Sequence, residues 1–188
     1  MVGLSNPGPD YEGTRHNVGA EAVRAVSRRC GTGRLRPEKG QRAVVEEVRI
    51  GAVRVALAIP NTYMNESGAT VRPLMRRFGI EDPSRLVVLH DELDLPPGRV
   101  RVKLGGGLAG HKGLQSVRDH LHTAEFVRVR IGIGKPPGRQ QGADYVLRRP
   151  GKAERALLDG AIETAADAVE IIVNEGVGAA MNRCNGDG

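Results

Sequence analysis

The chain has 188 residues and a formal net charge of +6, a size that suits one domain with its own hydrophobic core. Its two cysteines, Cys30 and Cys184, are too few for a disulfide framework. No apolar run reaches the roughly 20 residues of a membrane span and no secretory signal opens the chain, so we expect a cytoplasmic protein with no membrane partner.

The hydrophobic pattern predicts strands that alternate with helices. In chain order we expect a strand at 2–4, a helix at 18–30, a hairpin of strands at 44–48 and 53–59, a helix at 67–78, strands at 86–89 and 100–102, a helix at 114–122, a strand at 127–133 and a helix at 152–175. A glycine-rich loop at 105–113 and an open loop at 134–142 separate the later elements. This order predicts an α/β fold, a single domain over 1–188 with a twisted mixed sheet and helices on both faces.

Polar residues gather where the predicted strands end. Asn6 follows the first strand, the segment 61–65 follows the hairpin, and His90 and Asp91 come just past the end of the apolar run 86–89. Ligands of open α/β sheets bind beyond the carboxyl ends of the strands, so we expect a site there, with the glycine-rich loop as a further contributor.

The positive charge is concentrated in one part of the chain. Between Arg99 and Lys152 there are twelve Lys and Arg against three Asp and Glu, so the rest of the chain is net negative. Such a concentration favours a polyanionic partner, because basic side chains displace counterions from phosphates. An arginine-rich solvated surface explains the charge equally well.

Several familiar kinds of site do not fit the sequence. A Walker phosphate loop fails because His111 stands at the lysine position and no hydroxyl follows Lys112, and the dinucleotide fingerprint fails because Ser5 stands where its second glycine belongs. No serine lies in a Gly-x-Ser-x-Gly elbow. His120 and His122 are two apart on a predicted helix, so their rings point to different faces and disfavour zinc.

His16 and Asp91 remain as a candidate catalytic pair. A neutral imidazole takes a proton from water near neutral pH, and a carboxylate on its other nitrogen fixes its tautomer and orientation. Taken alone, the two residues are more simply explained as a surface histidine and an unrelated loop aspartate.

Segments spread over nearly the whole chain resemble bacterial peptidyl-tRNA hydrolases. They are GLSNPG with TRHNVG at 3–19, TYMNESG at 62–68, HDELDLP at 90–96, KLGGGLAGHKGLQS at 103–116 and RVRIGIG at 128–134. The resemblance implies hydrolysis of the ester between peptide and tRNA, with no metal or other cofactor and no obligate protein partner, by an enzyme that is a monomer.

The resemblance also implies roles for individual residues. His16 would be the general base, Asp91 would hold it basic, and Asn6 would distinguish a blocked peptidyl group from a free aminoacyl group. The residues that would bind the peptide and the tRNA 3′ end are Tyr11, Tyr63, Met64, Asn65, His111 and Lys112. We expect the amide of Asn65 to stabilise the oxyanion, and Lys103 and Arg130 to contact tRNA phosphates.

Simpler interpretations of these residues stay open. Asn6 would cap the Asn-Pro-Gly turn, Asn65 would be a helix N-cap, Tyr63 and Met64 would be core residues, and Lys112 would extend into water. For the whole chain, the alternatives are a non-catalytic RNA-binding relative of the same fold and a nucleotide-binding switch protein.

The sequence departs from the family pattern at three places. Lys112 replaces the family's asparagine, and Ala109 replaces a glycine that matters if the backbone there needs a positive φ. Most of the family's first strand is missing before Val2, so we expect a shortened central strand and a start codon further upstream.

Overall fold

The computed structural model describes residues 1–136, 138 and 142–186, and the predicted loop at 134–142 lies partly outside these residues. Seven strands form one sheet in the order β2-β3-β4-β1-β5-β7-β6. The strands are β1 (Val2–Gly3), β2 (Arg36–Pro37), β3 (Ala43–Ile50), β4 (Val53–Pro60), β5 (Val87–Glu92), β6 (Val100–Leu104) and β7 (Val127–Gly132). The central strands β4, β1, β5 and β7 are parallel, whereas β2, β3 and β6 are antiparallel to their neighbours, so the predicted mixed sheet is confirmed.

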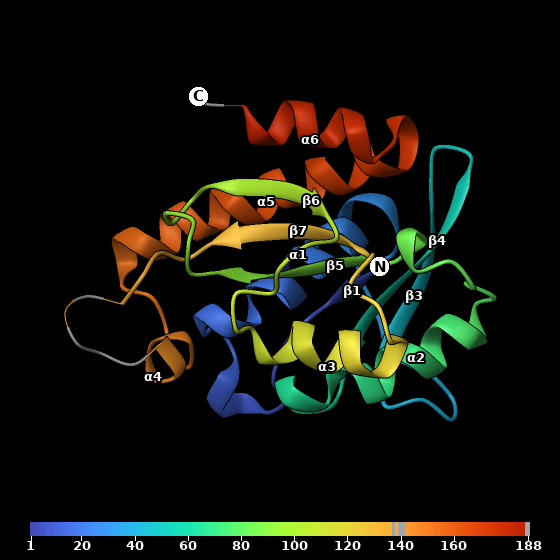
Figure 1. The fold of residues 1–188 in the computed structure, drawn as a ribbon, viewed down its shortest axis with the longest axis horizontal. Helices are drawn as coiled ribbons and strands as arrows, with labels where there is room; N and C mark the ends of the chain where they lie inside the picture. The colour runs from blue at the N-terminus through green and yellow to red at the C-terminus, as the bar shows by residue number, and fades with distance from the viewer. Residues whose placement is uncertain (137, 139–141, 187–188) are drawn as a thin grey trace.

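Helices cover both faces of this sheet (Figure 1). They are α1 (Val18–Cys30), α2 (Ser67–Arg77), α3 (Lys112–Leu121), α4 (Gly142–Val146), α5 (Lys152–Glu175) and α6 (Val177–Asn185), with short 3₁₀ turns η1 (Pro9–Tyr11), η2 (Arg15–Asn17), η3 (Met64–Glu66) and η4 (Pro83–Arg85). One core joins α1, α5 and α6 to one face of the sheet, and a second core joins α2 and α3 to the other face. Among the described residues, no helix combines the length and the apolar character that a membrane crossing requires.

Two close backbone contacts seat α1 directly on the central strands. A Cβ on Gly19 would lie 2.2 Å from the carbonyl oxygen of Leu89 in β5, and a Cβ on Gly3 would lie 2.4 Å from the carbonyl oxygen of Gly19. Larger residues at either position would push α1 off the sheet. The turn η2, which leads into α1, is thereby held next to the carboxyl end of β5.

Some expectations from the sequence were incomplete. The short elements β2, α4 and α6 were not predicted, and β5 continues through Glu92, so the prediction that Asp91 follows the strand is wrong. Parallel pairing with β7 extends β5, because Asp91 pairs with Ile131 and Glu92 pairs with Gly132. Helix α6 covers the edge strand β6, where the side-chain amide of Asn185 bonds both backbone groups of Val102.

Candidate active site

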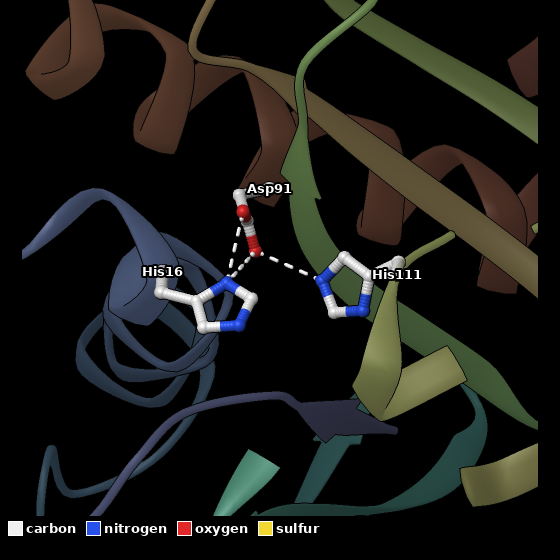
Figure 2. Close-up of side chains that lie close together, drawn as sticks. All are labelled: His16, Asp91 and His111. Carbon is white, nitrogen blue, oxygen red and sulfur yellow. Dashed lines mark hydrogen bonds and ion pairs between the residues drawn. The ribbon is translucent and has the colours of Figure 1, made fainter. Parts of the chain in front are cut away.

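Three side chains from separate parts of the chain meet at the end of β5 (Figure 2). Asp91 comes from β5, His16 from η2, and His111 from the loop that leads into α3. The Nδ1 atom of His16 lies 2.8 and 2.9 Å from the two carboxylate oxygens of Asp91. The Nε2 atom of His111 lies 2.9 Å from Oδ1 of the same carboxylate. The predicted pairing of His16 with Asp91 is therefore present in the structure.

The hydrogen bonds fix which nitrogen of each ring carries the proton. The backbone N–H of Leu114 donates to Nδ1 of His111, so Nε2 of His111 carries the proton that Asp91 accepts. His16 donates to Asp91 from Nδ1, and no described residue bonds its Nε2. The unprotonated Nε2 of His16 is therefore left as a base at the cavity that His16 lines.

Burial and charge act in opposite directions on this pair. Burial disfavours the imidazolium of His16, but the Asp91 carboxylate and its hydrogen bond outweigh burial and raise the pKa of His16 above its ordinary value. Burial likewise opposes the charge on Asp91, yet the two histidines hold the pKa of Asp91 far below its ordinary range. The two imidazoles therefore favour the ionised form of Asp91.

A third ring, that of His90, packs edge-on against His111 with ring centroids 5.0 Å apart. Its Nδ1 donates to the backbone carbonyl of Asp91 at 2.7 Å, while its Nε2 has no partner among the described residues. Burial lowers the pKa of His90 well below its ordinary value, with His111 adding to this effect. His90 is therefore a neutral support beneath the site, and the sequence placed it there with Asp91 but gave it no role of its own.

Among the described residues, one group of side chains of the types that bind metal ions lies close together, and it consists of His16, Asp91 and His111. Binding an ion through Nε2 of His111 would move its proton to Nδ1, where it would face the N–H of Leu114. Two donors would then oppose each other, so the hydrogen bonds at this site favour protons over a metal. His120, a residue of the weak zinc candidate, donates from Nδ1 to the carbonyl of Ser116 instead.

A cavity of about 780 Å³ opens beside the three residues. Asn6 lines it, and the Asn6 side-chain oxygen accepts the backbone N–H of Met64 at 2.7 Å. The backbone N–H and C=O of Asn6 are both held by the side chain of Asn17, at 2.8 and 2.9 Å. Asn6 is therefore more than a turn cap, because its side chain ties the turn after β1 to the turn after β4.

The cavity collects most of the predicted substrate-binding residues. Its lining includes Tyr63, Met64, Asn65, His111 and Lys112. Asn65 does not cap α2, whose N-cap is Glu66, so the simpler interpretation of Asn65 is wrong. Met64 is buried, as a core residue would be, while the Tyr63 side chain is exposed at the cavity rim. Tyr11 does not line the cavity and contacts Tyr63 edge-on, with ring centroids 6.3 Å apart.

The two predicted phosphate contacts lie outside the cavity on β6 and β7. Lys103 pairs in register with Arg128, so these two side chains and Arg130 share one face of the sheet. Arg130 donates from Nε to Glu92 at 3.0 Å, so its contact with solvent is limited to the remaining part of the guanidinium. Arg128 is buried and bonds the carbonyls of Gly105 and Gly107, which fixes the glycine-rich loop.

The sequence missed the apolar wall of the cavity that His16 also lines. This wall consists of Leu93, Ala143, Val146 and Leu147. The only sequence signal for it was the apolar run at 145–147, inside a segment that was left unassigned.

A buried carboxylate that orients an imidazole beside an open cavity, at the carboxyl end of a parallel strand, is an arrangement suited to a hydrolase that activates water by general-base catalysis. A sequence model of the family "Peptidyl-tRNA hydrolase" matches residues 1–188. The chain belongs to the peptidyl-tRNA hydrolase family.

Individual relatives agree with this assignment. The chain is 48% identical to the peptidyl-tRNA hydrolase of Cutibacterium acnes, over 98% of this chain and 96% of that one. It is 47% identical to that of Rhodococcus erythropolis, over 97% and 95% of the two chains. The crystal structure of the Acinetobacter baumannii peptidyl-tRNA hydrolase superposes with a TM-score of 0.90 at 38% identity, covering 98% of this chain and 92% of that one.

Proposed function

We propose that this enzyme hydrolyses the ester bond of peptidyl-tRNA with His16 as the general base. The observation that carries the proposal is the orientation of His16, whose Nδ1–H is held by Asp91 so that Nε2 is free for water. Nε2 removes a proton from a water molecule as the water attacks the ester carbonyl. When the tetrahedral intermediate breaks down, the imidazolium returns this proton to the leaving ribose oxygen, and the peptide leaves as a carboxylic acid.

The cavity supplies the remaining groups that the reaction needs. Asn65 lines it with no described hydrogen-bond partner for its amide, which supports a role as oxyanion donor. The amide nitrogen of Asn6 also has no described acceptor, so it is available to the carbonyl of a blocked amino group. Asp91 stays ionised throughout and stabilises the imidazolium that forms on His16.

We further propose that the tRNA backbone lies along the face that bears Lys103 and Arg130. The excess of basic residues in this part of the chain supports the proposal.

The three residues at the end of β5 come from one chain, which supports a monomer that needs no protein partner. Because peptidyl-tRNA arises on ribosomes, we place the enzyme in the cytoplasm.

The decisive experiment measures release of the acetylated amino acid from N-acetyl-aminoacyl-tRNA. We expect His16→Ala to lower kcat by about 100-fold or more, the usual effect of losing a general base. His120→Gln is a matched control, because His120 is also partly buried, near the end of α3, but bonds only the carbonyl of Ser116. A folded His16→Ala enzyme with near-normal turnover would exclude this mechanism. Binding of the substrate by the unaltered protein without any release would instead favour the non-catalytic RNA-binding alternative.

A further inference from the structure

Arg15, the residue before the catalytic base, is a cation with an unusual number of partners. Only 7% of the residue is exposed. Its Nε and Nη2 bond the two carboxylate oxygens of Glu154 in α5, each at 2.6 Å. Its Nη1 donates to the carbonyls of Tyr145 at 3.2 Å and Arg148 at 3.1 Å, and its guanidinium lies 4.0 Å from the centre of the Tyr145 ring. The backbone N–H of Arg15 also donates to the carbonyl of Arg148.

The two carbonyls that Arg15 holds lie on either side of Val146 and Leu147. Both of these residues line the cavity, and 40% of Leu147 is exposed there. Holding the chain immediately before and after the pair fixes how far both side chains reach into the cavity. Arg15 therefore connects the turn that carries His16 to the part of the apolar wall formed by Val146 and Leu147.

No other basic side chain could make this combination of contacts at position 15. A guanidinium offers donors on two edges and a flat face, so it can bind a carboxylate, two carbonyls and a ring together. A lysine in its place keeps the charge but reaches these groups from a single point. In Arg15→Lys we therefore expect the apolar wall to be displaced, while His16 and Asp91 stay in place.

We propose that Arg15 is a positioning residue for substrate selection, and that the wall it fixes is a subsite for an apolar side chain on the last residue of the peptide. That residue carries the ester, so its side chain branches one carbon away from the carbonyl that His16-activated water attacks. An apolar side chain there would cover the exposed surface of Leu147 and be removed from water. The inference rests on the proposed hydrolase activity and goes beyond it by naming what the enzyme prefers.

The test compares N-acetyl-leucyl and N-acetyl-glycyl esters carried on the same tRNA. For the unaltered enzyme we expect kcat/KM to favour the leucyl ester by about tenfold or more, since one apolar side chain is buried in one substrate only. In Arg15→Lys this preference should fall to about twofold, mainly through slower cleavage of the leucyl ester. Leu147→Ala should remove the preference in the same way, and the double variant should lose no more than Leu147→Ala alone.

Arg155→Lys is the matched control. Arg155 lies next to Glu154 in sequence and joins α5 to Glu21 of α1 at 3.0 Å, but it touches no part of the wall. It should lower the melting temperature without changing the leucyl-to-glycyl ratio. If Arg15→Lys does not fold, Leu147→Ala still measures the subsite.

Two results would overturn the inference. One is a ratio near unity in the unaltered enzyme, which would show that the wall selects nothing. The other is an equal loss for both esters in Arg15→Lys, which would show that Arg15 supports only folding or the catalytic step. Failure of the unaltered enzyme to cleave either ester would refute the proposed function itself, which is a different outcome.

Discussion

Replacing Asp91 by asparagine removes the negative charge that both His16 and His111 contact. The carboxylate is buried, and both carboxylate oxygens lie within 2.9 Å of Nδ1 of His16. Opposite charges about 4 Å apart attract by about 4 kcal/mol at an effective dielectric constant near 20, equivalent to about 3 pKa units. Burial of His16 acts against this attraction and remains in the variant. We therefore expect the pKa of His16 to fall from above its ordinary value to below it.

The direction of the change in activity follows from the role proposed for His16. A general base works when it is unprotonated, so kcat/KM rises with pH through the pKa of His16. In Asp91→Asn this ascending limb should move to lower pH by about 1 to 3 units. The plateau should also fall, though by less than in His16→Ala, because the imidazolium formed during the reaction has lost its counter-charge.

The structure also predicts that Nδ1–H of His16 keeps an acceptor after this substitution, although the amide NH₂ then stands at the Oδ2 position, 2.9 Å from the same nitrogen. The Nε2–H of His111 requires an oxygen, and Oδ1 of residue 91 accepts from both rings, at 2.8 Å from His16 and 2.9 Å from His111. An asparagine oriented by His111 would present its oxygen to both. In the double variant Asp91→Asn with His111→Phe, the asparagine would no longer be oriented by His111. Its kcat/KM should therefore show a further loss that His111→Phe alone does not predict.

The assay is release of labelled N-acetyl-amino acid from its tRNA ester between pH 5 and 9, with melting curves over the same range as the folding control. An ascending limb that stays in place, or that moves to higher pH, would refute the assignment of Asp91 as the group that raises the pKa of His16.

Three further predictions concern other parts of the molecule. Neutral substitutions of Lys103 and Arg130 together should raise KM and flatten its dependence on salt while kcat changes little; an unchanged salt slope would count against tRNA binding there. Ala109 has a φ of 47°, so Ala109→Gly should raise the free energy of unfolding by about 0.5–1 kcal/mol, measured by denaturant titration, and a lower value would show that the loop tolerates alanine without strain. Lys112 lines the cavity, so Lys112→Asn should move the ascending limb to higher pH and weaken the salt dependence of KM, and the absence of both effects would make Lys112 an ordinary surface residue.

The sequence predicted most of what depends on local pattern. The long helix α5 has the predicted bounds Lys152–Glu175, and the hairpin of β3 and β4 pairs as expected. What the sequence could not show depends on contacts between distant segments. Helix α6 forms where Asn185 reaches the edge strand β6, and α4 is held by Arg15 from far along the chain. Neither element has a strong apolar repeat of its own.

His111 shows why the candidate site could be located from sequence but not fully assigned. The resemblance placed it among the substrate-binding residues, and it does line the cavity. In the structure its Nδ1 also caps α3 by accepting the N–H of Leu114, and that bond determines which nitrogen faces Asp91. One ring thus contributes both to the start of α3 and to the orientation of the Asp91 carboxylate. Changes in the glycine-rich loop that displace this ring should therefore alter the pH dependence of catalysis, even where they contact neither substrate nor His16.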